Sequence, residues 1–408
     1  MGIYSKTLDG FDNILRVLAK EDKGKAVFAK VAAGVFSSAP GDVVRHDYEA
    51  GGDSWTVWES PRWKITGNGR KTYNSFFSKV DGFTCKFGER AADDPEWCAL
   101  GPEIADIEVV AGKCPKVNGG NCAFCYKGNG GGEARCMPLG KLDALLGAMP
   151  KCLTQVAFGI TGYYTNPDFG EMLSCARRHG VVPNYTTNGA DVDDAAVEKT
   201  LDECGRVAVS CYEGAKDLCY ATTGKFGKAA ERRGKKFPCN IHVVLSKATF
   251  PHVMSVLEDA RDGRIPNLGA VVVLRMKPVG RAAALDCVVP PGMYGDIVDF
   301  CLGAKVPFGF DSCGAKRVAE VLLDRGRPDL VGCVEPCEST RMSVYVSQAG
   351  KITPCSFCEG LMADRAVDAF AFRRPEDFIA AWNGDPMLSG FRAAALSCGK
   401  SCQVYDLD

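Results

Sequence analysis

Six short apolar runs alternate with helix-like segments between residues 106 and 306. After the second run, Phe169, Met172, Leu173 and Ala176 follow the i, i+3, i+4, i+7 spacing of one helix face. Strands that alternate with helices are typical of a parallel sheet with helical crossovers. The sequence therefore predicts an α/β fold, whose strands are IEVV, QVAFGI, VVPNYTT, VAVSCY, NIHVVLS and AVVVLRM.

The first run leads into a loop that carries three cysteines. Residues 108–131 read EVVAGKCPKVNGGNCAFCYKGNGG and contain Cys114, Cys122 and Cys125. Three thiolates on a loop behind a strand can hold three corners of an iron–sulfur cluster and leave the fourth iron open. The two-residue gap between Cys122 and Cys125 also suits zinc, although the next cysteine, Cys136, stands alone. Zinc and unliganded thiols are the alternatives.

At this loop the chain resembles the radical S-adenosylmethionine (radical SAM) enzymes. Their usual signature is Cys, three residues, Cys, two residues, Cys, with an aromatic residue before the last cysteine. Phe124 fills the aromatic place, but seven residues separate Cys114 from Cys122, so the loop is longer and no ligand is lost. The resemblance implies a [4Fe–4S] cluster, S-adenosylmethionine as cofactor, and a TIM-like partial (β/α)6 barrel. A full barrel needs about 250 residues and two more strands.

The resemblance also implies cofactor contacts at the carboxyl ends of the strands. The family's Gly-Gly-Glu position falls on residues 159–164, which contain no Glu, so Thr161 or a backbone carbonyl must meet the cofactor ammonium. Arg275 and Lys277 alternate onto one face of the last run, where they can reach a carboxylate of the cofactor or of a peptide. Ordinary polar strand ends are the alternative. The predicted cofactor-binding residues are Phe124, Gly159, Thr161, Thr187, Asn188, Ser210, Arg275 and Lys277.

A second group of cysteines follows residue 306. Twelve residues separate Cys337 from Gly350, and four separate Gly350 from Cys355. The intervening residues predict two short strands around a glycine turn, which brings the flanking cysteines together. This spacing resembles SPASM and twitch domains and implies one auxiliary [4Fe–4S] cluster rather than two, with zinc as the alternative. The expected ligands are Cys313, Cys337, Cys355 and Cys402, with Cys333, Cys358 and Cys398 in reserve.

Composition suits a cytoplasmic protein. The net charge of −1 gives no general attraction to nucleic acid or anionic lipid, and neither a signal peptide nor a membrane-spanning run is evident. In a reducing compartment the 21 cysteines stay thiols, so ligation best explains the spaced groups. Six solitary cysteines in apolar patterns are expected to be core residues: Cys152, Cys175, Cys204, Cys211, Cys239 and Cys301.

The chain is expected to form three parts: an N-terminal α+β region over 1–100, the barrel over 101–306, and the SPASM/twitch-like domain over 307–408. A helix is predicted over 11–20, and short strands in AVFAKVAAGVF and SWTVWESPRWKITGNG, before a polar stretch. This N-terminal region either covers one end of the barrel or recognises a substrate.

The resemblance implies an enzyme that cleaves S-adenosylmethionine reductively and uses the 5′-deoxyadenosyl radical to abstract a substrate hydrogen. The auxiliary cluster favours a ribosomally made peptide or protein as substrate, and flavodoxin or ferredoxin as electron donor. A small-molecule or tRNA-base substrate is an alternative. A non-catalytic, zinc-stabilised binding protein is an alternative of a different class.

Overall fold

The computed structural model describes residues 24–35, 37–90, 93–117, 120–397, 402–405 and 407. Within them, seven parallel strands lie side by side in chain order. All six predicted strands are confirmed, and β14 adds a seventh. The strands are β6 (Ile104–Glu108), β9 (Gln155–Gly159), β10 (Val182–Thr187), β11 (Arg206–Ser210), β12 (Cys239–Leu245), β13 (Leu268–Arg275) and β14 (Phe308–Phe310).

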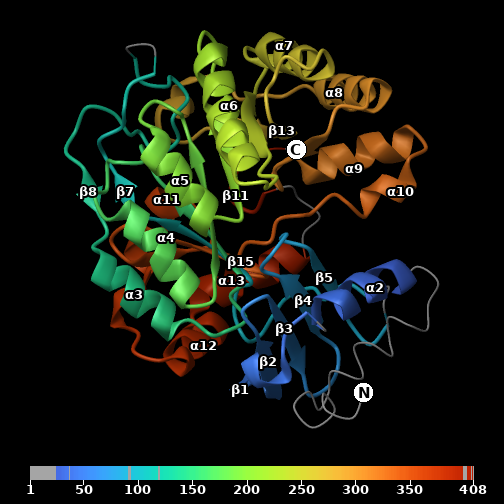
Figure 1. The fold of residues 1–408 in the computed structure, drawn as a ribbon, viewed down its shortest axis with the longest axis vertical. Helices are drawn as coiled ribbons and strands as arrows, with labels where there is room; N and C mark the ends of the chain where they lie inside the picture. The colour runs from blue at the N-terminus through green and yellow to red at the C-terminus, as the bar shows by residue number, and fades with distance from the viewer. Residues whose placement is uncertain are drawn as a thin grey trace.

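Helices connect these strands and cover the outside of the sheet (Figure 1). The predicted helix after β9 is confirmed as α4, and Phe169, Met172, Leu173 and Ala176 are fully buried. The sheet and these helices enclose the main hydrophobic core. The helices are α3 (Leu139–Ala148), α4 (Phe169–Arg178), α5 (Asp194–Glu203), α6 (Lys216–Arg232), α7 (Phe250–Arg261) and α8 (Pro291–Ala304).

The N-terminal region forms an antiparallel five-stranded sheet with helix α2 (Gly24–Val35) packed on it. The buried ammonium of Lys64 donates to the carbonyl of Leu153 (2.6 Å), just before β9. Contacts of this kind support a covering role at the amino ends of the parallel strands. The strands are β1 (Val44–Ala50), β2 (Asp53–Glu59), β3 (Trp63–Asn68), β4 (Asn74–Ser78) and β5 (Thr84–Phe87).

The strand prediction for AVFAKVAAGVF is wrong, because residues 26–35 lie in α2. Val27, Val31 and Val35 recur every four residues and pack against the sheet, and the alanines between them favour a helix. SWTVWESPRWKITGNG forms β2 and β3 as predicted, whereas β4 and β5 were missed in the stretch read as polar. The helix predicted over 11–20 lies outside the described residues.

The C-terminal third continues the large sheet. Strand β15 (Ser343–Val346) pairs in parallel with β6, and β16 (Lys351–Thr353) and β17 (Val367–Asp368) follow antiparallel. The predicted hairpin is confirmed, and its turn needs glycine, since Gly350 has φ +74° and faces the Phe370 ring. The remaining helices are α9 (Ala315–Asp324), α10 (Pro328–Val331), α11 (Glu359–Met362), α12 (Pro375–Gly384) and α13 (Pro386–Ser397).

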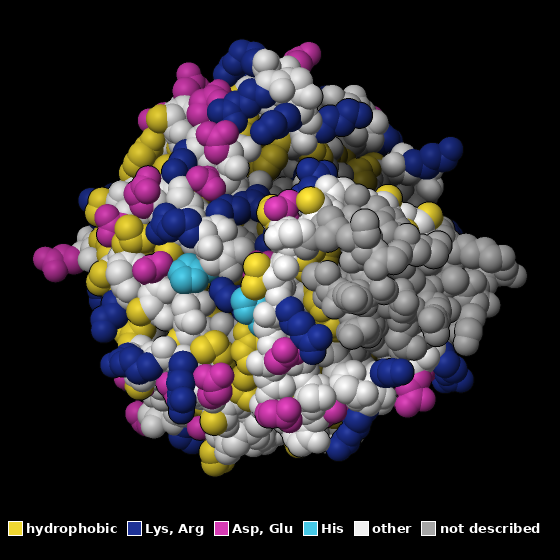
Figure 2. All heavy atoms as spheres, turned by 60° about the horizontal axis from the view of Figure 1, so that its bottom comes forward, with side chains coloured by type: hydrophobic (Ala, Val, Ile, Leu, Met, Phe, Trp, Pro, Cys, Tyr) yellow, Lys and Arg dark blue, Asp and Glu magenta, His cyan; other side chains and the backbone are white. Residues whose placement is uncertain are grey.

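The described surface is that of a mixed-charge protein. Lysine, arginine, aspartate and glutamate side chains are interspersed on the face in Figure 2, in keeping with a net charge of −1. In the described part of the chain, no helix has the length and apolar character needed to cross a membrane.

Candidate functional site

A cavity of about 610 Å³ lies at the carboxyl ends of the parallel strands. It is lined by Cys114, Cys122 and Cys125 and by every predicted cofactor-binding residue. The structure therefore brings together side chains that are up to 163 positions apart, from Cys114 to Lys277. The lining residues predicted from the sequence are Phe124, Gly159, Thr161, Thr187, Asn188, Ser210, Arg275 and Lys277.

The cluster loop, residues 112–134, runs between β7 (Val110–Ala111) and β8 (Arg135–Cys136), which pair antiparallel. Arg281, in the short 3₁₀ helix after β13, holds this loop through its carbonyls. Its guanidinium donates to Cys122 O (2.9 Å), Gly128 O (3.0 Å) and Asn129 O (2.9 Å). The sequence shows Arg281 near a Pro-Gly turn, but its role was missed, since its partners lie about 150 residues away.

The three thiols are half-buried and close enough to affect one another. Burial, followed by the neighbouring Cys122 and Cys125, raises the pKa of the Cys114 thiol to about 11. The three thiols lie at one wall of the cavity, where they can ligate either an iron–sulfur cluster or zinc.

Two predicted cofactor contacts have buried polar atoms that no described residue satisfies. These are Oγ1 of Thr161 and Nε of Arg275. Buried polar atoms normally have partners, so these two cavity-lining side chains are candidates for ligand contacts. The Asn188 amide donates to Pro115 O (3.4 Å) and Thr161 O (3.5 Å), which ties the cluster loop to the segment that follows β9. The residues present therefore fit a cluster and a polar cofactor.

Lys277, which was expected to bind a carboxylate of the cofactor or of a peptide, already has a carboxylate partner within the protein. Its buried ammonium forms an ion pair with Asp311 and lies over the Phe357 ring, 4.6 Å from the centroid. A cofactor carboxylate at Lys277 would therefore compete with Asp311. Arg275 has no such carboxylate partner among the described residues, so it is the better candidate for this contact.

A buried polar network on the cavity wall was also missed from the sequence. Lys127, from the cluster loop, contacts Glu108 at the end of β6 (3.1 Å) and donates to the Tyr345 hydroxyl (2.8 Å). Tyr345 donates to Glu108 (3.0 Å), and Glu359 pairs with Lys127. Burial raises the pKa of Glu108 despite the opposing charge of Lys127. The network joins the first strand, the loop and the C-terminal hairpin.

A second cavity, of about 190 Å³, is lined by all four predicted auxiliary ligands: Cys313, Cys337, Cys355 and Cys402. The Cys402 sulfur accepts hydrogen bonds from the backbone N–H groups of Val404 and Tyr405, both at 3.4 Å. Burial outweighs these hydrogen bonds and raises the pKa of the Cys402 thiol. Among the reserve residues, Cys358 lies 3.3 Å from Cys355, sulfur to sulfur, and Cys333 is exposed. Cys398 lies outside the described residues.

The two cavities share a wall of five residues: Asp106, Lys277, Asp311, Ser356 and Phe357. Asp106 opens to cavity space on this wall. The protein atoms around the Asp106 carboxyl shield it from bulk water, and the Glu338 carboxylate lies nearby. The loss of hydration and, to a smaller extent, the Glu338 charge raise the pKa of Asp106 to about 6.

No family model and no curated protein matches the sequence. Solved structures do share the fold. SuiB of Streptococcus suis, bound to precursor peptide SuiA, is 12% identical, with 82% of this chain and 90% of that chain covered and a TM-score of 0.60. SuiB by itself gives 12% identity, coverages of 79% and 88%, and a TM-score of 0.56.

SuiB bound to S-adenosylmethionine is 13% identical, with 72% of this chain and 66% of that chain covered and a TM-score of 0.53. Identities this low establish the fold alone. The α/β fold with a parallel sheet, which the alternating sequence pattern predicted, is thereby confirmed.

Proposed function

We propose that this chain is a radical SAM enzyme that abstracts a hydrogen atom from a ribosomally made peptide or protein. The observation that carries the proposal is the 610 Å³ cavity, where three cysteines and eight predicted cofactor contacts meet. The chemistry that a reduced [4Fe–4S] cluster supplies there is one electron for the cleavage of S-adenosylmethionine. The shared fold with SuiB, which binds S-adenosylmethionine, supports this function.

The chain's own residues divide the work of binding. Cys114, Cys122 and Cys125 hold the cluster, and the Arg281 guanidinium fixes the loop that carries them. The unpartnered Thr161 hydroxyl meets the cofactor ammonium in place of the absent Glu. The other cofactor contacts are expected as follows: the Arg275 guanidinium binds the carboxylate, Ser210 contacts the ribose or the carboxylate, and Phe124 forms an apolar wall beside the adenine.

A peptide substrate is supported by the second cavity and by the fold. Four cysteines line a pocket that shares a wall with the first, in keeping with an auxiliary [4Fe–4S] cluster near the reacting substrate. SuiB, which has this fold, was solved with a precursor peptide. We place the enzyme in the cytoplasm, with flavodoxin or ferredoxin as electron donor. A small molecule or tRNA base, and a zinc-stabilised binding protein, remain the alternatives.

The decisive experiment is anaerobic reconstitution with iron and sulfide, reduction, and measurement of 5′-deoxyadenosine. The wild-type protein should be brown and release 5′-deoxyadenosine, and Cys114→Ala, Cys122→Ala and Cys125→Ala should release none. Cys136→Ala is the matched control, because Cys136 is adjacent to the loop but does not line the cavity. A colourless zinc protein, or release by all three variants, would refute the proposal.

A further inference from the structure

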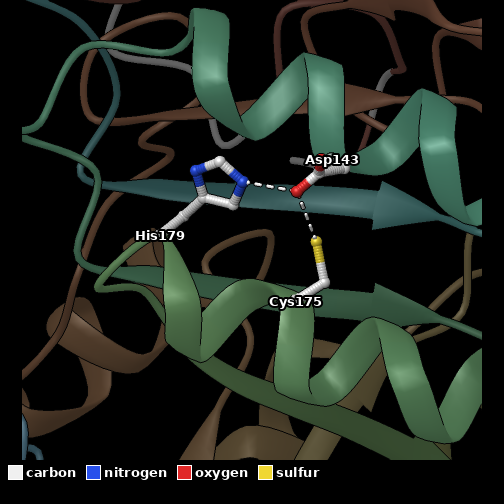
Figure 3. Close-up of side chains that lie close together, drawn as sticks. All are labelled: Asp143, Cys175 and His179. Atoms are coloured by element: carbon white, nitrogen blue, oxygen red, sulfur yellow. Dashed lines mark hydrogen bonds and ion pairs between the residues drawn. The ribbon is translucent and has the colours of Figure 1, made fainter.

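Helices α3 and α4 bring together three ligand-type side chains outside both cavities (Figure 3). Asp143 belongs to α3, Cys175 to α4, and His179 caps the end of α4. Cys175 and His179 are four residues apart, so they lie on the same helix face. In the described part of the chain this is the one group of three such residues whose ligand atoms all lie within 4.8 Å.

The distances are close to those of a single ion's coordination sphere. Oδ1 of Asp143 lies 2.9 Å from Nε2 of His179 and 3.3 Å from Sγ of Cys175, between the two, as the dashed lines in Figure 3 show. With metal bonds of about 2.0 Å to oxygen or nitrogen and about 2.3 Å to sulfur, ligands on a tetrahedral zinc lie about 3.3–3.5 Å apart. The two Asp143 pairs therefore need shifts of a few tenths of an ångström, and Sγ of Cys175 and Nε2 of His179, which lie within 4.8 Å of each other, must approach by up to about 1.3 Å.

We propose that Asp143, Cys175 and His179 form a zinc site, with water as the fourth ligand. A thiolate and a carboxylate together balance the charge of Zn²⁺, and the nitrogen, sulfur and oxygen set is one that zinc accepts. The Asp143 side chain is 56% exposed, which gives the ion an entry path and a place for the water. Cys175 is buried as its sequence pattern predicts, and its sulfur lies in contact with the exposed Asp143 carboxylate.

The location indicates what the ion does. Helix α3 follows the cluster loop and β8, and α4 follows the segment that contains Gly159 and Thr161. An ion bound by both helices would crosslink α3 and α4. It would thereby stabilise the positions of the cluster loop and of the segment that contains Gly159 and Thr161. This role is structural, because none of the three ligands lines either cavity.

The test uses the reconstituted, cluster-loaded protein, so that iron occupies the other spaced cysteines. After incubation with Zn²⁺ and desalting, the wild-type protein should retain about one zinc per chain more than Cys175→Ser, His179→Gln or Asp143→Asn. Cys301→Ser is the matched control, since Cys301 is a buried helical cysteine outside this group and should leave the zinc unchanged. If the wild type and the three ligand variants retained equal amounts of zinc, the proposal would be wrong. Asp143, Cys175 and His179 would then only be hydrogen-bonded to one another.

A second readout separates zinc binding from loss of folding. Added Zn²⁺ should raise the melting temperature of the wild type and of Cys301→Ser, because an ion that binds only the folded state stabilises it. The ligand variants should show no rise. Asp143→Asn keeps this test usable if Cys175→Ser fails to fold, since Asp143 is largely exposed. A zinc-dependent rise in Asp143→Asn and His179→Gln equal to that of the wild type would also overturn the proposal.

Discussion

At the scale of single residues, the cluster loop depends on one arginine from a distant strand end. Arg281 donates from its guanidinium to three loop carbonyls, and its backbone N–H donates to Cys125 O (3.1 Å). The preceding residue must be glycine, because Gly280 has φ +61° and a Cβ there would overlap the Tyr126 carbonyl. Only arginine offers this planar fork of donors, so lysine cannot replace it.

Replacement of Arg281 by Ala or Lys should therefore loosen the loop without unfolding the protein. Hydrogen bonds from a charged donor contribute about 1.5–3 kcal/mol each, so the loss of three should shift the loop toward open states. We expect Arg281→Ala to release iron to a mild chelator at least about tenfold faster than the wild type. Arg327→Ala, which removes an exposed arginine paired with Asp329, is the control. Identical release from both variants would contradict the role of Arg281.

The Asp106 carboxyl predicts a pH-dependent change in stability. Its pKa is about 6 when folded and 3.8 when unfolded, so its contribution to stability is fully present below pH 3.8 and is lost as the pH rises through 6. The full shift corresponds to about 3 kcal/mol, but the side chain is open to cavity water, so we expect about 1 kcal/mol. When both proteins are free of clusters, Asp106→Asn should thus have a higher free energy of unfolding than the wild type at pH 7.5.

Urea unfolding of both proteins at pH 7.5 and at pH 4 measures this difference. At pH 4 the stability difference should nearly vanish. The Asp106 carboxyl is then largely neutral in the folded state, and the pH is close to the pKa of 3.8 that it has in the unfolded state. A constant difference at both pH values would mean that Asp106 affects stability through packing and not through its charge.

The sequence predicted residues with a local signature and missed those without one. Cysteine spacing and position at strand ends identified the predicted residues that line the two cavities. Both features can be recognised from residues that are close together in the sequence. The roles of Arg281, Glu108 and Lys127 were missed, since charged side chains at a strand end or in a loop usually face solvent. Their roles depend on partners such as Tyr345, 237 positions from Glu108.

At the scale of elements, a buried arginine joins the C-terminal helices to the segment that precedes the parallel sheet. Arg392 of α13 donates to Thr340 O (2.6 Å) and to Trp382 O (2.7 Å) in α12. Its guanidinium also stacks on Trp97 at 4.2 Å and on Trp382 at 4.7 Å from the ring centroids. Trp382 in turn donates to Cys98 O (2.8 Å), so one stack links α12, α13 and residues 97–98.

Arg392→Ala should destabilise this unit by about 2–4 kcal/mol, because it leaves two buried carbonyls unpaired and removes the cation over two rings. Limited proteolysis should cut the chain within α12 or α13 several times faster than in the wild type. Arg232→Ala, which removes a 65% exposed arginine, should leave the cutting rate unchanged. Equal rates for Arg392→Ala and Arg232→Ala would show that the stack does not hold the C-terminal helices.

Helices and strands with a regular pattern of apolar residues could be predicted from the sequence. The pairing of strands that are far apart in the sequence could not. The parallel strands are buried between the helices and the interior, so they appear as continuous apolar runs. In α2 the same apolar character was mistaken for a strand, although Val27, Val31 and Val35 have helical spacing. The sequence indicated the β15–β16 hairpin, but not that β15 pairs with β6, because the partners are 239 positions apart.

At the scale of the whole molecule, the two cavities lie on either side of one polar wall. Lys277 touches both, and its ammonium lies near the Cys313 thiol as well as Asp311. The hairpin that contributes Cys355 is hydrogen-bonded to β6, the strand that leads into the cluster loop. The sheet therefore holds the two cysteine groups at a fixed separation.

This arrangement predicts two clusters that fill independently. Three cysteines in the first cavity and four in the second can each hold four irons, so anaerobic reconstitution should give about 8 iron atoms per chain. A triple Ala variant of Cys114, Cys122 and Cys125 should keep about 4, because the second cavity does not use the loop. Its cluster should have thiolates on all four irons and bind no S-adenosylmethionine.

Loss of a ligand in the second cavity has a different expected effect. Cys313 and Cys402 belong to opposite ends of the C-terminal third, and near Cys402 the Tyr405 hydroxyl donates to Phe357 O (2.8 Å) on the shared wall. Removal of either cysteine should lower the iron to about 4 and speed proteolysis of residues 307–408, because a metal centre that joins distant segments contributes its binding energy to folding. If the triple variant instead holds no iron, or holds one zinc, the second cavity carries no auxiliary cluster. The argument for a peptide substrate then weakens, while the proposed chemistry at Cys114, Cys122 and Cys125 is unaffected.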